Sequence, residues 1–323
     1  MKKILLVLIT AFLMAGILSG CSRQQDHDPE DKKLQIVTTI FPVYDWVMNV
    51  LGDNPGNAEV TMLLDTGADL HSYQPTAADM MKITSADIFI YIGGESDEWV
   101  EDVLKNSSSD KCIVMNLMDI LGDRIREEEH VEGMEHDHEE EEEETEYDEH
   151  IWLSLRNAAV RIKRIEEALS KADSGNASVY QNNRSSYIQK LDDLDRQYRA
   201  AVSRASVKTL LFADRFPFRY LTEDYGLNYY AAFAGCSAES EASFETVTFL
   251  ARKIDELNLK AVLTIEGTDH RIADTVIRTT VSGNQKILTL NSLQSVTARD
   301  VAQGISYLTV MEENLKVLKE ALQ

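Results

Sequence analysis

The stretch LQIVTTIFPVYDWVMNVLG, residues 34–52, predicts a strand followed directly by a helix. Residues 34–39 are rich in apolar and β-branched side chains, which is typical of a buried strand. Pro42 suits the first turn of a helix, and Gly52 suits its end. A strand joined to an amphipathic helix is the repeating unit of a parallel sheet that is covered by helices.

The same alternation of strand and helix recurs along both halves of the chain. Further strands are predicted at residues 59–64, 87–92, 113–115, 209–213, 228–233, 261–265 and 286–290. Further helices are predicted at residues 75–83, 154–170, 178–206, 217–225, 271–280 and 298–322, and after Ser243. The predicted fold class is α/β, with two similar lobes of mainly parallel sheet joined by one long rigid helix.

The pattern also predicts where the lobes begin and end. The N-terminal lobe is expected at residues 34–175, including an acidic, histidine-rich loop at residues 123–149. The linking helix is expected at residues 176–206, and the C-terminal lobe at residues 207–323.

Residues 1–21 have the features of a secretion signal, a short basic start followed by an apolar stretch and small residues. The sequence LSGC, which ends at Cys21, resembles the lipobox of bacterial lipoproteins. That resemblance implies cleavage before Cys21 and attachment of lipid to its sulfur. The alternative is an ordinary signal peptide with an incidental cysteine. Residues 22–33 are polar and are predicted to form a flexible tether.

The formal net charge of −23 argues against nucleic acid or an anionic membrane surface as a partner, and it favours cations. Two cysteines, Cys112 and Cys236, follow the lipobox. They could pair in an oxidising compartment, but we expect free thiols. We also expect a monomer.

Much of the acidity lies in one block, EEEHVEGMEHDHEEEEEETEYDEH, at residues 127–150. The block holds four of the seven histidines, and imidazoles among carboxylates suit a divalent metal such as zinc. So acidic a run cannot form a core, so a mobile loop is expected. Its histidines His130, His136 and His138 are predicted to be accessory sites that recruit zinc weakly. The alternatives are a segment that senses metal and tunes transport, and a merely solvated segment.

Other polar residues follow predicted strands, and ligands of open α/β sheets bind beyond the carboxyl ends of the strands. Such residues are His71, His150, Asp214, Glu266 and Asn291. Each also has a purely structural interpretation, since a loop histidine is often a surface group. Asp214 could cap the next helix, and Glu266 and Asn291 could be ordinary polar groups at strand ends or helix caps.

Two ordered motifs make a family resemblance specific. GADLHSYQP, residues 67–75, is similar to the motif Gly-x-Asp-Pro-His-x-Tyr-Glu-Pro of metal-binding receptors of ATP-binding-cassette transporters. EHIWLSLRNA, residues 149–158, resembles the Asp-Pro-His-x-Trp-Leu-x-Pro motif of the same family. The acidic loop and the long helix also match. The resemblance implies a lipid-anchored receptor on the outer face of the cytoplasmic membrane. Such a receptor delivers Zn²⁺ or Mn²⁺ to a permease that a cytoplasmic ATPase drives.

The resemblance also implies a set of metal ligands. His71 and His150 match the first two. An ungapped match puts Arg215 at the third position, but arginine stays protonated and has no lone pair, so Asp214 is the expected substitute. Asn291 matches the fourth position, with Glu266, a water molecule or Cys236 as alternatives.

Two imidazoles with carboxylate or amide oxygens suit zinc, and manganese is the alternative cargo. A surface zinc enzyme is a rival from another class, although the chain has no His-Glu-x-x-His motif. A lipid-anchored adhesin is a second rival. We therefore expect a receptor that transports zinc and catalyses no reaction.

Overall fold

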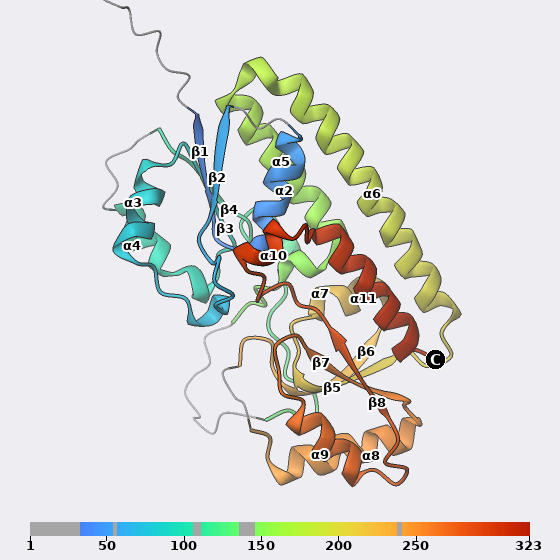
Figure 1. Ribbon diagram of the computed structural model, residues 1–323. Coiled ribbons are helices and arrows are strands. Elements are labelled where there is room, and N and C mark those ends of the chain that lie inside the picture. Colours follow the sequence, from blue (N-terminus) through green and yellow to red (C-terminus); the bar gives the residue numbers. More distant parts are fainter. Residues whose placement is uncertain (1–32, 54–56, 106–110, 136–145, 238–240) are drawn as a thin grey trace, which may run out of the picture. The chain divides into compact units, whose positions relative to one another are not determined.

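The computed structural model describes residues 33–53, 57–105, 111–135, 146–237 and 241–323 (Figure 1). The predicted signal peptide with Cys21, nearly all of the predicted tether, and His136 and His138 lie outside these residues. Where the chain is described, no helix is both long enough and apolar enough to cross a membrane.

Each lobe is built on a four-stranded sheet. The first consists of β1 (Leu34–Thr38), β2 (Ala58–Met62), β3 (Ile88–Tyr91) and β4 (Ile113–Asn116). The second consists of β5 (Thr209–Arg215), β6 (Asn228–Phe233), β7 (Ala261–Ile265) and β8 (Lys286–Leu290). The strand orders are β2-β1-β3-β4 and β6-β5-β7-β8, and every pairing is parallel. The two lobes therefore share one topology, and the predicted fold class is confirmed.

Helices cover both faces of the first sheet (Figure 1). On one side lie α3 (Ala77–Ser85) and α4 (Trp99–Lys105), and on the other lie α2 (Phe41–Leu51) and α5 (Leu155–Ala172). As predicted, α2 has a proline in its first turn and ends at Gly52, whose φ of 79° is one that glycine adopts without strain. No strong periodic signal had predicted the short helix α4.

The longest helix, α6 (Ala177–Arg204), contacts helices of both lobes. It packs against α2 and α5, and also against α7 (Arg219–Tyr225) and α11 (Tyr307–Ala321). Its buried side chains form an apolar stripe that includes Tyr180, Tyr187, Leu191, Leu194 and Tyr198. A helix with its apolar side held by both lobes connects them stiffly.

The second lobe repeats the layered arrangement, with α8 (Phe244–Leu257) and α9 (Arg271–Thr279) below its sheet in Figure 1. The prediction of one final helix over residues 298–322 is wrong. The chain forms α10 (Ala298–Ala302), turns at Gly304 with a φ of 90°, and begins α11 after the capping residue Ser306. Gly304 permits a left-handed turn that ends the first helix.

One hydrophobic core contains side chains from both lobes. Trp46 of α2 is fully buried, and its ring meets that of Tyr307 of α11 edge to face at 5.3 Å between centroids. Because both lobes contribute side chains to this core, the contact between the lobes is not purely polar.

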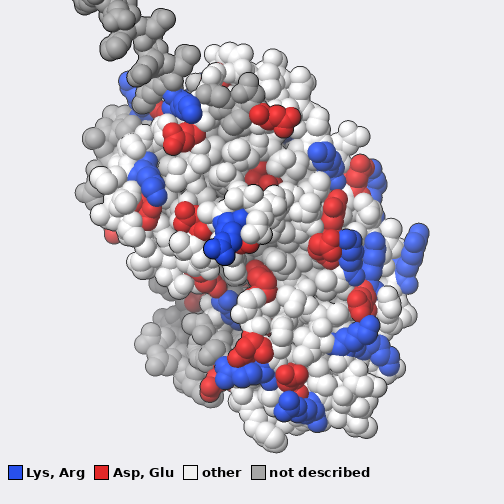
Figure 2. All heavy atoms as spheres, in the orientation of Figure 1, with Lys and Arg blue, Asp and Glu red and all other residues white. Residues whose placement is uncertain are grey.

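Charges of both signs are interspersed over the face drawn in Figure 2, so this face carries no large patch of one sign. The acidic block at residues 127–150, by contrast, has fifteen carboxylates and neither lysine nor arginine. Most of the net negative charge is therefore concentrated in one segment of the chain.

Replacing Trp46 by alanine should remove the main aromatic contact between α2 and α11. We expect the free energy of unfolding to fall by about 3–5 kcal/mol, because the substitution leaves a large cavity in the core. Urea unfolding followed by circular dichroism measures the change.

The control is Val281→Ala, since Val281 is 93% exposed. That change should alter stability by less than about 0.5 kcal/mol. If the two variants unfolded at the same urea concentration, the shared core would not hold the lobes as described.

Candidate metal centre

His71 lies on a short 3-10 turn (Leu70–Ser72) in the loop after β2. The Asp69 carboxylate caps this turn by accepting a hydrogen bond from the His71 backbone N–H at 3.1 Å. Leu70 is buried in the core and anchors the turn from below. The imidazole is thus held at the carboxyl edge of the first sheet, where ligands of such sheets bind.

His150 lies at the end of the acidic block and is fully buried. The Asp148 carboxylate accepts hydrogen bonds from its backbone N–H, at 2.8 Å, and from Nδ1 of its ring, at 3.1 Å. Two residues later the Trp152 indole donates to the Ser292 carbonyl at 2.8 Å, and the Tyr307 hydroxyl donates to the Trp152 carbonyl at 2.6 Å. The His150 turn is therefore fastened to the second lobe.

The two imidazoles face each other through their Nε2 atoms, which are 3.2 Å apart. Both Nδ1 atoms have other partners, Asp148 for His150 and the Ser96 hydroxyl, at 2.8 Å, for His71. With hydrogen on Nδ1, each Nε2 presents a lone pair to the other ring. Two nitrogens bound to tetrahedral zinc at about 2.0–2.1 Å lie about 3.3 Å apart. The observed spacing is close to the one that a shared zinc ion requires.

The surroundings also set the protonation of the pair. Burial, and then the adjacent His150, lower the pKa of His71 to about 3. Burial lowers the pKa of His150 as well, but the Asp148 carboxylate more than offsets it, so the pKa of His150 is raised. Near neutral pH, His71 is a neutral imidazole that can bind a metal without first losing a proton.

The third group at this place is Cys236, in the loop after β6. The ligand atoms of His71, His150 and Cys236 all lie within 4.8 Å of one another. Gly235 permits this approach, since a Cβ there would lie 3.1 Å from the His150 ring. Burial, and then the carboxylates of Glu128, Glu149 and Asp148, raise the pKa of the Cys236 thiol. Both Cys112 and Cys236 are free thiols, as predicted.

The structure does not bring the other predicted ligands into this group. Asp214 accepts backbone hydrogen bonds on both oxygens, from Arg215 at 2.9 Å and from Ile265 at 3.1 Å. Glu266 accepts from the backbone and the hydroxyl of Ser292 at 2.6 and 2.7 Å. These bonds tie strand ends together, and neither carboxylate belongs to the three-residue group found among the described residues.

Asn291 has a similar structural role. Its side-chain oxygen accepts from the Leu293 backbone at 2.8 Å, and its own backbone exchanges two hydrogen bonds with the Asn314 side chain. The assignment of Asp214, Glu266 and Asn291 as ligands stays a prediction, which these hydrogen bonds do not favour.

Arg215 points to a different partner. Its guanidinium donates to the Asp69 carboxylate at 2.7 Å, across 146 residues of sequence. Since Asp69 also caps the His71 turn, this ion pair links the first strand of the second lobe to the His71 turn. The guanidinium therefore positions the site from outside and offers no electron pair to a metal.

A cavity of about 350 Å³ leads to His71 and Cys236. We call it the vestibule, and its lining also includes Ser96, Tyr147 and the acidic residues Glu95, Glu98, Glu128, Glu146 and Glu149. Burial, and then neighbouring carboxylates, raise the pKa of Glu146. Carboxylates crowded in this way attract a cation, which relieves their mutual repulsion.

Backbone contacts join the two ends of the acidic block, and the mobility of the block stays a prediction. Glu127 pairs with Tyr147 in an antiparallel bridge, and the Glu128 backbone donates to the Glu146 carbonyl at 2.9 Å. The Glu128 carboxylate accepts from the Cys236 backbone at 2.9 Å. His130, in the same block, is exposed to solvent. His136 and His138 lie outside the described residues.

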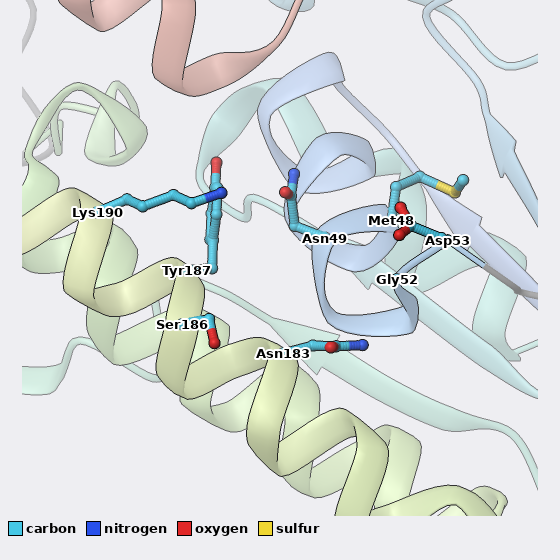
Figure 3. Close-up of a pocket in the computed structure, with 8 residues that line it drawn as sticks. All are labelled: Met48, Asn49, Gly52, Asp53, Asn183, Ser186, Tyr187 and Lys190. Carbon is cyan, nitrogen blue, oxygen red and sulfur yellow. The ribbon is translucent and has the colours of Figure 1, made fainter.

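A larger cavity of about 500 Å³ lies elsewhere, between the end of α2 and the middle of α6 (Figure 3). Its lining residues are Met48, Asn49, Gly52, Asp53, Asn183, Ser186, Tyr187 and Lys190. This lining has one carboxylate and no histidine or cysteine, so it does not offer the ligands that zinc prefers.

Sequence reasoning named Cys236 as one of several candidates for the fourth ligand. It missed Ser96 and Asp148, which orient the two rings. The spacing Asp148-x-His150 was an available signal, because metal-binding histidines commonly donate their second N–H to a carboxylate.

The chain is similar to known zinc-binding and zinc-uptake proteins. The family model for ZnuA, the periplasmic component A of a zinc-uptake complex, matches residues 36–321. The zinc-binding lipoprotein AdcA of Streptococcus pneumoniae is 34% identical over 324 residues, which is 99% of this chain and 61% of the relative. This chain thus spans about three fifths of that relative. The high-affinity zinc uptake system protein ZnuA of Bacillus subtilis is 29% identical over 98% of this chain and 97% of its own length.

Solved structures show the same fold. The Zn(II)-bound ZnuA-like domain of S. pneumoniae AdcA superposes with a TM-score of 0.71 at 30% identity, and covers 90% of this chain and 99% of that domain. The metal-dependent lipoprotein YcdH of B. subtilis superposes with a TM-score of 0.73 at 28% identity, over 90% of this chain and 99% of that one. The resemblance predicted from the two motifs is confirmed, and the chain belongs to the ZnuA family of periplasmic zinc-uptake components.

Proposed function

We propose that this protein captures Zn²⁺ outside the cytoplasmic membrane and delivers it to a membrane permease that an ATPase drives. His71 and His150 are the two imidazole ligands in this proposal. Family membership supports it, as do relatives named as zinc-binding lipoproteins and as a zinc uptake protein. The zinc ion is the cargo of the protein, so binding must be tight but reversible.

The observation that carries the proposal is the opposed pair of Nε2 atoms, 3.2 Å apart. Two lone pairs at this distance repel each other unless a proton or a cation lies between them. The hydrogen bonds of Ser96 and Asp148 to the opposite ring nitrogens keep both lone pairs directed at one point. A site prepared in this way binds a metal without rearranging its histidines.

The vestibule supports a route for the ion from solvent to this pair. Five glutamates line it, together with His71 and Cys236. Their negative field raises the local concentration of divalent cations and so speeds capture. His130, His136 and His138 extend the same role in the acidic block, as weak accessory sites.

Attachment to the membrane through a lipid on Cys21 belongs to the same proposal. It would keep the receptor on the outer face of the cytoplasmic membrane, within reach of its permease. Incorporation of labelled palmitate that is lost on Cys21→Ala would support it, and unchanged labelling of that variant would refute it.

Manganese is the alternative cargo. A dissociation constant for manganese that is lower than that for zinc, measured in metal-buffered solution, would overturn the choice of zinc. Zinc is favoured because affinity for nitrogen-containing sites rises from manganese to zinc. The metal-competent group found in the described residues contains two histidines, a cysteine and no carboxylate. Manganese prefers harder, oxygen-rich sites.

His71→Ala should weaken zinc binding by ~100-fold or more, because loss of an outer-shell partner alone costs ~10–100-fold. Competition with a chromophoric chelator measures the constant. The control is His270→Asn, since His270 lies at the start of α9 with a φ of 58°, a conformation that asparagine tolerates. A His71→Ala protein that binds zinc as tightly as this control would refute the proposed site.

Zinc affinity should fall as pH is lowered, since protons compete with zinc for the histidines. The fall should begin above the ordinary histidine pKa of about 6.5, because Asp148 raises the pKa of His150. Protonation of His71, whose pKa is about 3, should lower the zinc affinity only in much stronger acid. Titrations between about pH 5 and pH 8 measure the profile.

The matched variant is Asp148→Asn, which removes the charge that stabilises protonated His150 and keeps a similar shape. In this variant, the loss of zinc affinity that protonation of His150 causes should occur at lower pH. A profile that moved to higher pH, or did not move, would contradict the assigned role of Asp148.

Replacing His130, His136 and His138 by alanine together should leave one tight zinc site and remove weaker ones. The reason is that neither member of the tight pair is one of these three histidines, since His150 is the last residue of the acidic block and His71 lies outside it. Equilibrium dialysis across a range of free zinc measures both classes of site. Loss of the tight site would show that the accessory histidines hold the cargo themselves.

A further inference from the structure

We propose that the thiolate of Cys236 is the third protein ligand of the captured zinc ion, which gives a site of two imidazoles and one sulfur. This inference rests on the proposed function and goes beyond it, because it names a ligand of a different chemical type. The cysteine takes the place that Arg215 and Asp214 do not fill.

The position of the sulfur supports a shared ion. In a tetrahedral zinc site with Zn–N of about 2.0–2.1 Å and Zn–S of about 2.3 Å, nitrogen and sulfur lie about 3.6 Å apart. Here the sulfur and both nitrogens fit within 4.8 Å. A movement of about 1 Å in one loop is enough to close the site.

The loop that carries Cys236 is placed from both directions. The backbone N–H of Cys236 donates to the Glu128 carboxylate at 2.9 Å, which fixes the loop to the acidic block. On its other side Gly235 lies so close to His150 that a Cβ would be 3.0 Å from the Phe216 carbonyl and 3.1 Å from the imidazole. A larger residue at position 235 would push the sulfur away from the histidines.

The neighbouring candidates are already engaged. The Arg215 guanidinium donates to Asp69 at 2.7 Å and carries a permanent positive charge. Both oxygens of Asp214 accept backbone hydrogen bonds. Cys236 is the group from the second lobe whose ligand atom lies beside the two histidines in the described part of the chain.

Zinc binding by this thiol balances simply. The sulfur–hydrogen bond breaks, the zinc–sulfur bond forms through the electron pair left on sulfur, and one proton leaves to solvent. No oxidant or reductant is required. The positive ion also offsets the carboxylates of Glu128, Glu149 and Asp148 that surround the sulfur.

A thiolate ligand has a consequence for selectivity. Sulfur is a soft donor that suits zinc and is a poor ligand for manganese, which prefers oxygen. The cysteine should therefore increase the preference for zinc over manganese beyond what two histidines provide.

Cobalt substitution tests the inference, because Co²⁺ occupies zinc sites and a thiolate bound to it gives a near-ultraviolet charge-transfer band. The full-length protein, purified in detergent, is loaded with one equivalent of Co²⁺. We expect the band in the unchanged protein and in Cys112→Ser, since Cys112 directly precedes β4 at the opposite, amino-terminal edge of the first sheet. Cys236→Ser should lose it.

Zinc competition on the same proteins gives the second readout. Cys236→Ser should bind zinc ~100-fold more weakly or worse, as expected for loss of a direct ligand when outer-shell changes alone cost ~10–100-fold. Cys236→His should regain most of the affinity and still lack the band. That rescue separates a ligand from a thiol needed only for packing.

These outcomes test the sulfur ligand and the receptor function separately. Tight zinc binding with no charge-transfer band, or with an affinity unchanged in Cys236→Ser, would overturn the sulfur ligand and leave the receptor function standing. Absence of tight zinc binding in the unchanged protein would overturn the receptor function itself.

Discussion

Trp152 holds the two lobes in the arrangement on which the candidate metal centre depends. Its indole donates to the Ser292 carbonyl, and its own carbonyl accepts from the Tyr307 hydroxyl. Both bonds are buried, where an unpaired group would cost about 1–3 kcal/mol. Since His150 lies two residues earlier in the same turn, these bonds fix an imidazole of the first lobe against the second. The same contact therefore serves stability and function.

In the proposed zinc site, groups that repel one another are held close together, and a bound cation would relieve this repulsion. The Nε2 atoms of the two imidazoles face each other, and five glutamates line the vestibule beside His71. Such an arrangement is unfavourable without a cation and becomes favourable when one enters. The shared core and the Arg215–Asp69 ion pair hold these groups in place. In the proposed function, stiffness between the lobes is thus part of the binding mechanism.

The alternation of strand and helix was predictable from sequence, because hydrophobic period and turn residues act locally. The histidines were predictable because each lies in an ordered motif. The hydrogen-bonding roles of Asp214 and Arg215 were not predictable from sequence, because β5 has an irregular register between Phe212 and Arg215. Such an irregularity changes the direction in which the following side chains point, and only tertiary pairing reveals it. The position of Cys236 depends on how two loops of different lobes meet, which no local pattern encodes.

X-ray absorption at the zinc edge of the loaded protein tests whether zinc lies between His71 and His150. We expect about two imidazole nitrogens at about 2.0–2.1 Å and one sulfur at about 2.3 Å from the zinc ion. The imidazole signal should weaken in His71→Ala and in His150→Ala. A shell of oxygen atoms alone, unchanged by either substitution, would contradict the claim that zinc is held between His71 and His150.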